Sequence, residues 1–390
     1  MEENYKYSQR GVSATKSEVH DAIKGMDKGL YPNAFCKILP DVVGGDGAYC
    51  NLMHADTAGT KTSLAYIYWR ETGDLNVWKG IAQDALVMNL DDMGCVGCVN
   101  DIVISSTIGR NKHLISGDVI ATIINAANEF RNTLAEFGIG VYLSGGETAD
   151  VGDIVRTLDV GYTTFARMKR SEVIKNDIQA GDVIVGLASY GQATYEDAYN
   201  GGMGSNGLTS ARHDVFSKVY LDKYPESCDP NTPREVVYTG SKKLTDTIII
   251  GDEELSIGQL VLSPTRTYLP VIKRLLDALP GKINGIIHCT GGGQAKVKNF
   301  ITNKKVIKDN LLPIPPLFQL IQKESGTAWR EMYQVFNMGH RLEVYLPEEL
   351  AQKVVDISQS FDIAAQIIGR VEECDGEVVS VVSPYGEFVY

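Results

Sequence analysis

Carboxylates recur at the ends of candidate strands and helices, next to glycines or other small residues. Asp56 precedes a turn of small residues that leads to Lys61. Asp92 follows an apolar helical pattern, and Glu147 follows two glycines after a short strand. Mg²⁺ prefers carboxylate oxygens and often binds together with phosphates, and glycine turns let backbone N–H groups approach such a ligand. These residues therefore predict a site for a divalent cation and a phosphorylated ligand.

His288 is the histidine whose sequence context is most informative. It ends an apolar strand pattern and is followed by the glycine turn Thr290–Gly293. A histidine in such a place either contacts a ligand or is a half-buried structural residue. The residues alone leave both interpretations open.

Three other patterns have ordinary structural interpretations. Cys95-Val-Gly-Cys98 has no second pair to complete a zinc site, so we expect two small core residues. Thr60 precedes Lys61 where a P-loop needs glycine, so that match fails. Gly202–Gly207 fits GxGxxG, but it follows a long polar loop instead of a first strand, which argues against dinucleotide binding.

The elements that would position these residues alternate between helical and β-branched patterns. Strands are expected near 49–54, 101–107, 141–144, 157–167 and 183–188, and helices near 63–71, 82–92 and 117–137. Residues 223–258 are polar and loop-like. Charged turn residues separate two apolar segments near 176–181, which favours a domain boundary there. The sequence thus predicts an α/β (α+β) fold in two domains, residues 1–178 and 179–390.

Composition excludes several classes of function. The 390 residues carry a net charge of −12 without a basic run, so we expect no nucleic-acid partner. No window of 18 apolar residues exists, and Met1–Arg10 lacks the apolar core of a signal peptide. The seven cysteines are odd in number and scattered, as in reduced proteins. We therefore expect a cytoplasmic protein that is not bound to membranes.

Eight segments follow one another between about residues 40 and 340 in an order that resembles a known enzyme family. They are Asp56–Lys61, Asp84 with Asp91-Asp92, Gly145–Asp150, Gly181–Val185, Ser205–Gly207 with Arg212, Ser263–Tyr268, His288–Gly293 and Glu331–Gly339. The GGET motif occurs across a wider ATP-binding superfamily, whereas the PTR, HxTGGG and EMYxxFNxG motifs together are more specific. On these motifs the chain resembles aminoimidazole ribonucleotide (AIR) synthetase, the phosphoribosylformylglycinamidine cyclo-ligase.

The resemblance implies an N-terminal α/β domain that pairs in a homodimer and binds ATP and Mg²⁺, and a C-terminal α/β domain. It implies ATP-dependent cyclisation of formylglycinamidine ribonucleotide to 5-aminoimidazole ribonucleotide in de novo purine biosynthesis, with release of ADP and phosphate. ATP would phosphorylate the formyl oxygen, and the amidine nitrogen would then close the ring. Such phosphoryl transfer depends mainly on positioning and charge neutralisation.

The resemblance also implies a role for individual residues. The magnesium ligands would be Asp56, Asp92 and Glu147. The nucleotide would contact Gly44, Gly45, Gly47, Asp56, Thr60, Lys61, Asp92, Gly145, Gly146 and Glu147. The substrate would contact Ser205, Asn206, Arg266, Thr290, Gly291 and Asn337. The catalytic residues would be His288, Asn206 and Lys61.

The chain departs from the family pattern at three positions. Asp46 stands in the glycine loop where the family carries Phe. The family carries an Asn-Asp pair, and Asn100-Asp101 has the same residue types whereas Asp91-Asp92 does not. The spacing from Asp84 nevertheless favours Asp92 as the metal ligand. Gly204 replaces the histidine that precedes Ser-Asn-Gly, so the acid–base residue is open, with His213 and His288 as candidates.

Two alternatives come from different classes. One is another enzyme of the superfamily, such as thiamine-phosphate kinase, selenophosphate synthetase or formylglycinamidine synthetase. The other is a nucleotide-binding module that has lost catalysis, an interpretation that the change at Gly204 motivates. Substrate-dependent turnover separates them, because a lapsed module would bind ATP without it.

Overall fold

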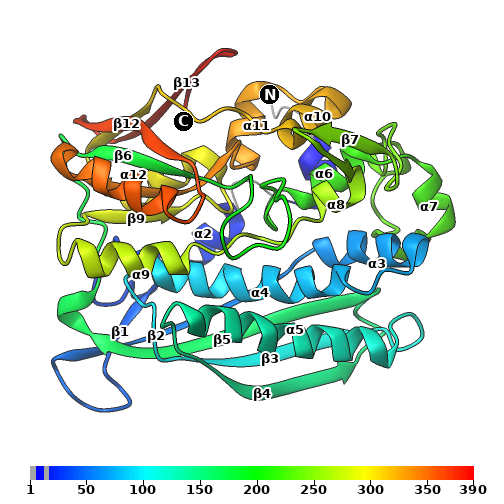
Figure 1. Cartoon of the computed structure of the whole chain (residues 1–390), viewed down its shortest axis with the longest axis horizontal. Helices are drawn as coiled ribbons and strands as arrows, with labels where there is room; N and C mark the ends of the chain where they lie inside the picture. Colours follow the sequence, from blue (N-terminus) through cyan, green and yellow to red (C-terminus); the bar gives the residue numbers. More distant parts are fainter. Residues whose placement is uncertain (1–5, 13–16) are drawn as a thin grey trace.

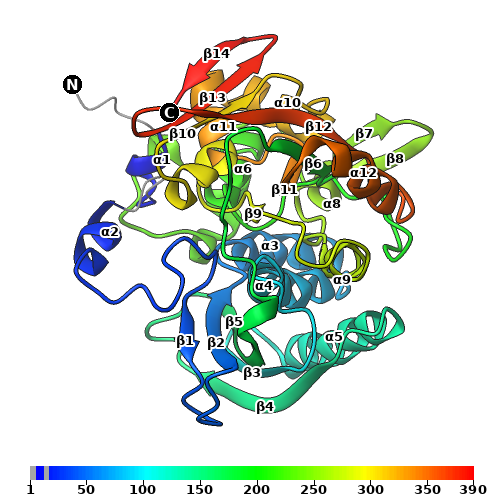
Figure 2. The ribbon, with the colours of Figure 1, turned by 90° about the vertical axis from the view of Figure 1, so that its left-hand side faces the viewer.

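Two mixed sheets lie in separate layers, with helices between them (Figures 1 and 2). The computed structural model describes residues 6–12 and 17–390. One sheet lies on each side of the helical layer. This arrangement confirms the α/β fold expected from the sequence.

The first sheet contains five strands in the order β1-β2-β5-β3-β4. Their bounds are β1 Ile38–Pro40, β2 Tyr49–Thr57, β3 Ile102–Arg110, β4 Val141–Asp150 and β5 Leu158–Lys169. Only β3 and β4 pair in parallel, while the other neighbours are antiparallel. Helices α3 (Lys61–Thr72), α4 (Val77–Gly94) and α5 (Gly117–Glu136) cover one face.

The helices differ in how much of their surface they bury. α5 is amphipathic, and its apolar residues at helical spacing, including Val119, Ile123 and Leu134, are buried. α4 is buried on nearly all sides because it lies between the first sheet and the C-terminal half. The carboxylates of α4 are therefore held in the interior, at the boundary between the two halves.

The other face of the first sheet carries a row of apolar side chains that no element in the described part of the chain covers. Met53, Phe165, Val103 and Tyr142 are direct neighbours across β2, β5, β3 and β4. Met53, Val103 and Tyr142 are 63%, 39% and 56% exposed. We call these four residues the open-face row. Such a contiguous apolar stripe on a sheet is typical of an interaction surface.

The second sheet contains seven strands in the order β14-β13-β10-β12-β6-β11-β9. Their bounds are β6 Val183–Ala188, β9 Gly285–His288, β10 Lys304–Lys308, β11 His340–Leu346, β12 Ala365–Glu373, β13 Glu377–Ser383 and β14 Gly386–Val389. β10 and β13 are parallel, and the other pairs are antiparallel. All residues of β6 and β11 are buried, as expected for central strands covered on both faces.

Helices and short 3-10 turns surround the second sheet. The helices are α6 Leu208–Val215, α7 Val219–Lys223, α8 Ile257–Val261, α9 Leu269–Ala278, α10 Pro316–Ser325, α11 Trp329–Val335 and α12 Ala351–Gln359. The 3-10 turns are η1 Arg170–Glu172, η2 Pro225–Ser227, η3 Arg234–Val236, η4 Gly293–Phe300 and η5 Glu348–Leu350. The polar segment 223–258 is not purely a loop, because β7 (Thr247–Ile250) and β8 (Glu253–Ser256) form a hairpin within it.

The N-terminal segment is attached to the second half of the chain. Short helices α1 (Lys6–Gln9) and α2 (Ser17–Ile23) precede the first sheet. Arg10 is buried, and its guanidinium lies 2.6 Å from Asp214 and donates to Ser210 Oγ and the carbonyl of Val236. The domain boundary at residues 178 and 179 falls between η1 and β6 and stays a prediction.

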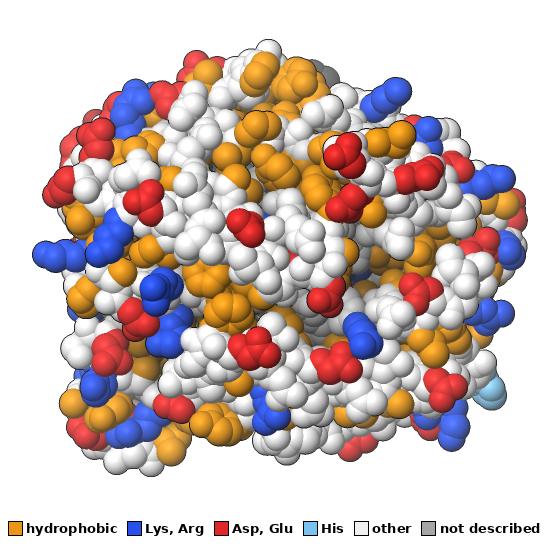
Figure 3. Space-filling model, viewed as in Figure 1, with side chains coloured by type: hydrophobic (Ala, Val, Ile, Leu, Met, Phe, Trp, Pro, Cys, Tyr) orange, Lys and Arg blue, Asp and Glu red, His pale blue; other side chains and the backbone are white. Residues whose placement is uncertain are grey.

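The molecular surface carries interspersed charges. On the face shown in Figure 3, acidic and basic side chains alternate without an extended basic patch. Among the described residues, no helix combines the length and apolar character needed to cross a bilayer. All seven cysteines are free, and Cys95 and Cys98 are buried, as expected for small core residues.

Candidate active site

Asp92 lies where the two halves of the chain meet. It is on the last turn of α4, between a histidine from each sheet. Its Oδ1 is 2.7 Å from Nδ1 of His288, at the end of β9, and its Oδ2 is 3.3 Å from Nε2 of His54, on β2. Asn89, about one turn before Asp92 on α4, orients His54. The distance between Asn89 Oδ1 and His54 Nδ1 is 3.1 Å. One carboxylate therefore joins the two sheets.

Two hydrogen bonds orient the ring of His288. Arg341 donates from Nε to His288 Nε2 over 3.2 Å, so Nε2 is an acceptor and the ring proton lies on Nδ1, facing Asp92. Burial works to raise the pKa of Asp92, but the hydrogen bonds from His288 and His54 outweigh it and hold that pKa well below its usual range. Burial opposes protonation of His54, yet Asp92 and Asn89 raise the pKa of His54. Asp92 is thus ionised.

Two further carboxylates of α4 hold the segment Ser263–Tyr268 against the helix. Asp84 accepts hydrogen bonds from the N–H and the hydroxyl of Thr265, at 2.7 and 2.6 Å. Asp91 accepts from the hydroxyl of Thr267 and the N–H of Tyr268, at 2.6 and 2.8 Å. Because these positions are seven residues apart, both side chains project from the same face of α4. They position the segment and do not reach the cavity described below.

Two of the predicted ligand-binding cations are enclosed by protein. Lys61 is fully buried, and its ammonium donates to Asp84 over 2.8 Å and to the carbonyl of Ser263 over 2.6 Å. Burial lowers the pKa of Lys61, and the charge of Asp84 opposes that shift. Arg266 is also buried, and it pairs with Glu196 at 2.5 Å. The contacts of these two cations are with the protein itself, so their ligand-binding roles stay predictions.

A cavity of about 520 Å³ opens beside Asp92. Its lining includes Asp56, Asp92, Asn206, Thr290, Gly291, Lys296, Lys298 and Arg330. Five of these residues were predicted from the sequence, and the structure brings them together. The cations Lys296 and Lys298 on η4 and Arg330 on α11 were missed. Carboxylates and cations around one cavity can together hold a metal ion and the phosphates of a nucleotide.

The side-chain amide of Asn337 is hydrogen-bonded to the loop that precedes α6. Asn337 donates from Nδ2 to the carbonyl of Gly202 over 2.8 Å and accepts from Ser189 Oγ over 2.8 Å. Asn206, four residues after Gly202, lines the cavity, whereas Asn337 itself is buried. The hydroxyl oxygen of Ser205 is buried and has no hydrogen-bond partner among residues 6–12 and 17–390. Its predicted contact with a substrate is therefore compatible with the geometry.

The predicted glycine loop lies far from Asp56 in the same chain. The turn Gly44–Gly47 precedes β2, and Asp41 ties it by accepting from the N–H of Gly44. Asp56 lies seven residues after Tyr49, the first residue of β2, which corresponds to roughly 23 Å along the strand. Thr60 lies nearer Asp56, and its hydroxyl is 2.7 Å from that of Thr209. The contact of the glycine loop with a phosphate stays a prediction.

Glu147 does not join Asp56 and Asp92 within one chain. It is paired with Thr107, which is on the same face of β3 as Val103 of the open-face row. Asp56 comes three residues after Met53 on β2. Because successive side chains of a strand point to opposite faces, Asp56 lies on the face that the helices cover. About three strand spacings, or roughly 14 Å, also separate the two positions. Accordingly, the described part of the chain contains no group of three or more side chains able to hold a metal ion.

A register shift explains why the face of Glu147 was hard to foresee. The pairing of β3 and β4 shifts between Ile104 and Ser106, where β4 gains a residue. A Cβ on Gly146 would lie 2.1 Å from the carbonyl oxygen of Ser106, so the shift requires glycine there. Gly145 and Gly146 thus shape the strand that carries Glu147, and their contact with a nucleotide stays a prediction.

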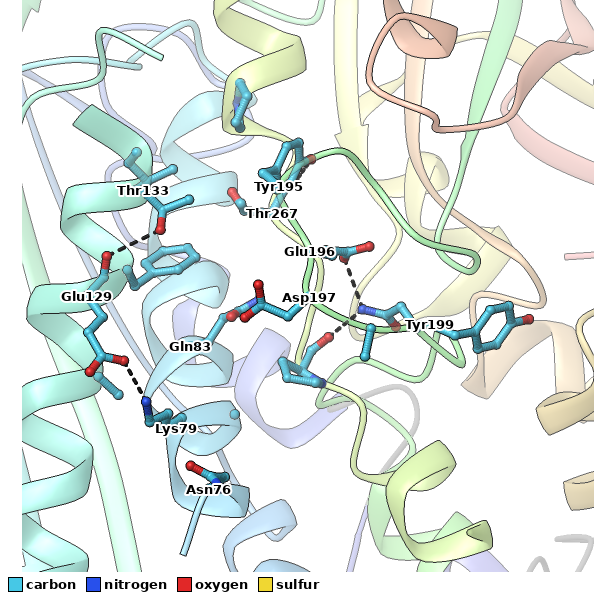
Figure 4. Close-up of a pocket in the computed structure, with 18 residues that line it drawn as sticks. Asn76, Lys79, Gln83, Glu129, Thr133, Tyr195, Glu196, Asp197, Tyr199 and Thr267 are labelled. Carbon is cyan, nitrogen blue, oxygen red and sulfur yellow. Dashed lines mark hydrogen bonds and ion pairs between the residues drawn. The ribbon is translucent and has the colours of Figure 1, made fainter. Parts of the chain in front are cut away.

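A second cavity, of about 410 Å³, lies between α4, α5 and residues 195–200 (Figure 4). Lys79 and Glu129 form an ion pair of 2.9 Å at one side, and Glu196 lines the other. None of Asp56, Asp92 and Asn206 lines this cavity. It is therefore separate from the site around Asp92.

The comparisons with known proteins agree with this architecture. Family models described as AIR synthase related protein match the chain over residues 39–168 for the N-terminal domain and 179–382 for the C-terminal domain. A phosphoribosylformylglycinamidine cyclo-ligase of Methanococcus vannielii is 31% identical over 375 residues, which cover 94% of this chain and 89% of the relative. One from Methanosarcina barkeri is 26% identical and covers 98% and 99%.

Solved structures share the fold at low sequence identity. A crystal structure of a HypE–HypF complex matches with a TM-score of 0.54 and 15% identity, covering 97% of this chain and 99% of that chain. Thiamine monophosphate kinase from Aquifex aeolicus matches with a TM-score of 0.52 and 11% identity, covering 94% of each. With both family models matched in order and a cyclo-ligase 31% identical over most of its length, the chain belongs to the AIR synthase related family.

Proposed function

We propose that this protein is a phosphoribosylformylglycinamidine cyclo-ligase, an ATP-dependent ligase of purine biosynthesis. The observation that carries the proposal is its likeness to curated cyclo-ligases over nearly the whole chain, at 31% identity in one case. The site adds support, because carboxylates and cations line the same cavity beside the loop of Asn206. The substrate is formylglycinamidine ribonucleotide, and the product is 5-aminoimidazole ribonucleotide.

The reaction first phosphorylates the formyl oxygen, which is otherwise a poor leaving group. The formyl oxygen attacks the terminal phosphorus of ATP, so that an O–P bond forms and ADP leaves. The amidine nitrogen then attacks the formyl carbon, the C–O bond breaks, inorganic phosphate departs and a proton is lost from nitrogen. The protein needs no covalent nucleophile for these steps, only charge neutralisation and alignment.

Asp56 and Asp92 are the residues of this chain that fit Mg²⁺ in the cavity. Both offer carboxylate oxygens, and the depressed pKa of Asp92 keeps it ionised. A bound Mg²⁺ would neutralise phosphate charge during the transfer. Lys296, Lys298 and Arg330 would contribute to binding the phosphates from the other wall of the cavity.

We further propose that two copies of the chain pair through the open-face row. The exposed Met53, Val103 and Tyr142 would be covered in such a dimer. Glu147 is on the same face of the sheet, so it would point into the interface. A partner's Glu147 could then approach the metal site that it does not reach in its own chain.

A cytoplasmic location fits the chemistry. The substrates are soluble phosphorylated metabolites, and all seven cysteines are free thiols, as in reducing compartments.

The proposed function is tested by turnover of the purified protein. ATP, Mg²⁺ and formylglycinamidine ribonucleotide are mixed with it, aminoimidazole is detected by diazo coupling, and ADP release is measured in parallel. Product that requires all three components is the expected result. ADP without product would overturn the cyclo-ligase and point to another phosphoryl acceptor, such as thiamine phosphate. ATP binding without turnover would identify a module that has lost catalysis.

A further inference from the structure

Arg341 carries a buried positive charge that the protein only partly satisfies. It is on β11, and just 1% of its surface is exposed. Its Nε donates to His288, its Nη2 donates to the carbonyl of Arg266, and its guanidinium lies 5.3 Å from the centre of the Tyr268 ring. Its Nη1 is buried without a hydrogen-bond partner among the described residues. Because unsatisfied buried donors are costly, such an atom indicates a ligand.

The unpartnered nitrogen faces the bare side of Gly204. A Cβ built on Gly204 would lie 3.4 Å from Nη1 and 3.7 Å from Cδ of Arg341. Gly204 has a φ of +70°, a conformation in which other residues are strained. The next residue, Ser205, holds the second unpartnered polar atom of this region, its buried Oγ. Two unsatisfied hydrogen-bonding groups therefore belong to the same corner of the structure.

Within residues 6–12 and 17–390 no carboxylate forms an ion pair with Arg341, although the charge of Asp91 lies close enough to interact with it. Asp92 reaches it only through His288, which accepts from Arg341 at Nε2 and contacts Asp92 through Nδ1. A guanidinium in this situation attracts an anion with oxygen acceptors, and phosphate is the anion that it binds best. Asn206, two residues after Gly204, lines the cavity, so this corner is connected to the cavity through two residues of the chain.

We propose that Arg341 Nη1 and Ser205 Oγ form the binding site for one phosphate oxygen of the reacting complex. The proposal rests on the proposed function, because that function supplies the phosphates. Two sources share this chemistry, the phosphoryl group in transfer and the phosphate ester of the ribonucleotide. Because Gly204 has no Cβ, no side chain of residue 204 stands beside Nη1, so the glycine and the arginine act as a pair.

Four variants test the pair. Arg341→Gln removes the charge, and Arg341→Lys keeps the charge but loses the forked donors. Gly204→Ala leaves every contact of Arg341 in place and puts a methyl group beside Nη1. Gly181→Ala is its matched control, because Gly181 has a φ of +94°, lies outside the site and has nothing within 4 Å of the added Cβ. Far-UV circular dichroism and thermal melting confirm that each variant folds.

The measurements are kcat and KM for each substrate, the dissociation constant of the ribonucleotide without ATP, and inhibition by inorganic phosphate. We expect Arg341→Gln and Gly204→Ala to lower kcat/KM for the ribonucleotide by about 100-fold and to weaken phosphate inhibition, with Gly181→Ala unchanged. If the phosphate ester is bound, the dissociation constant of the ribonucleotide rises. If the transferred phosphoryl group is bound, kcat falls while that constant stays the same.

Unchanged kinetics and phosphate inhibition in folded Gly204→Ala would overturn the proposal, even if Arg341→Gln fails to fold. Equal effects of Gly204→Ala and Gly181→Ala would overturn it too, because backbone strain would then account for the loss. A wild-type protein that makes no aminoimidazole would refute the proposed function instead. In that case titration with inorganic phosphate still tests Arg341, since folded Gly204→Ala must bind phosphate more weakly than the wild type.

Discussion

The ammonium of Lys61 lies 2.8 Å from the carboxylate of Asp84, and neither side chain has any exposed surface. The pair joins the first turn of α3 to α4, and the additional hydrogen bond from Lys61 to Ser263 joins both helices to the second half of the chain. It is thus a buried ion pair at the centre of the two-domain arrangement.

Replacing Lys61 by methionine should destabilise the protein. The change leaves the Asp84 carboxylate buried without its counter-charge, which costs about 3–5 kcal/mol of unfolding free energy. The double variant Lys61→Met with Asp84→Asn should recover part of that loss, because the amide oxygen still accepts from Thr265. Urea unfolding measures both. A Lys61→Met protein of wild-type stability but with a raised KM for ATP would show instead that Lys61 acts at the nucleotide.

Asp92→Asn should abolish magnesium-dependent turnover, whereas Asp101→Asn should leave it unchanged. Asp92 lines the cavity and pairs with two histidines, so the change removes the proposed metal ligand and its charge. Asp101 is exposed, and its φ of 55° is one that asparagine adopts readily. Turnover over a range of Mg²⁺ concentrations is the measurement. Equal losses in both variants would refute the choice of Asp92 as the ligand.

Mixing two inactive variants should restore activity if Glu147 acts across a dimer. In a mixed dimer of Asp92→Asn and Glu147→Gln chains, one site has both defects and the other has none. Random exchange of subunits should therefore recover about a quarter of wild-type turnover. No recovery, despite demonstrated exchange, would show that Glu147 serves its own chain or no site.

A separate experiment tests whether the open-face row is the interface of the proposed dimer. Met53→Glu places a charge in the open-face row and should convert the proposed dimer to monomers in analytical ultracentrifugation. Ile154→Glu is the control, because Ile154 is an exposed apolar residue outside the row. A Met53→Glu protein that remains dimeric would place the interface elsewhere.

The stability of the protein should fall as the pH drops below about 6.5, and His213 should contribute to this fall. Burial, followed by the charges of Arg212, Arg10 and Lys218, lowers the pKa of His213 well below its ordinary value. The folded state therefore keeps it neutral while the unfolded chain takes up a proton, so its contribution is complete above the unfolded pKa and is lost at lower pH.

His213→Asn should make that pH dependence shallower. An asparagine oxygen can accept the hydrogen bond that His213 Nδ1 receives from the N–H of Tyr238. We expect the slope between pH 6 and 5 to fall by up to about 1.4 kcal/mol per pH unit, as measured by urea unfolding. Identical slopes in both proteins would mean that His213 is not the group responsible.

The sequence was sufficient for features that depend on local pattern. The helix expected at 117–137 is observed as Gly117–Glu136, because its apolar spacing matches one buried face. Asp56, Asp92, Asn206, Thr290 and Gly291 were predicted at the site and do line one cavity. Their motifs lie at the ends of regular elements, where side chains converge.

Other features depend on contacts that no local pattern encodes. The ion pair of Lys61 could not be predicted, because Asp84 lies on another helix and only the packing of α3 on α4 reveals the contact. The face of Glu147 depends on a register shift between strands. Arg341 was not predicted as a site residue, because its unpartnered nitrogen is apparent only where β11 lies beside Gly204.

The burial of Arg10 has a consequence for the order of events during synthesis. Its partners Ser210, Asp214 and Val236 are more than 190 residues away in sequence. When the first sheet and its helices have left the ribosome, these partners have not yet been made, so Arg10 must remain hydrated until the second half emerges. The N-terminal segment therefore docks only after residues 210–236 have been made, and a bulky tag beside it would slow that docking.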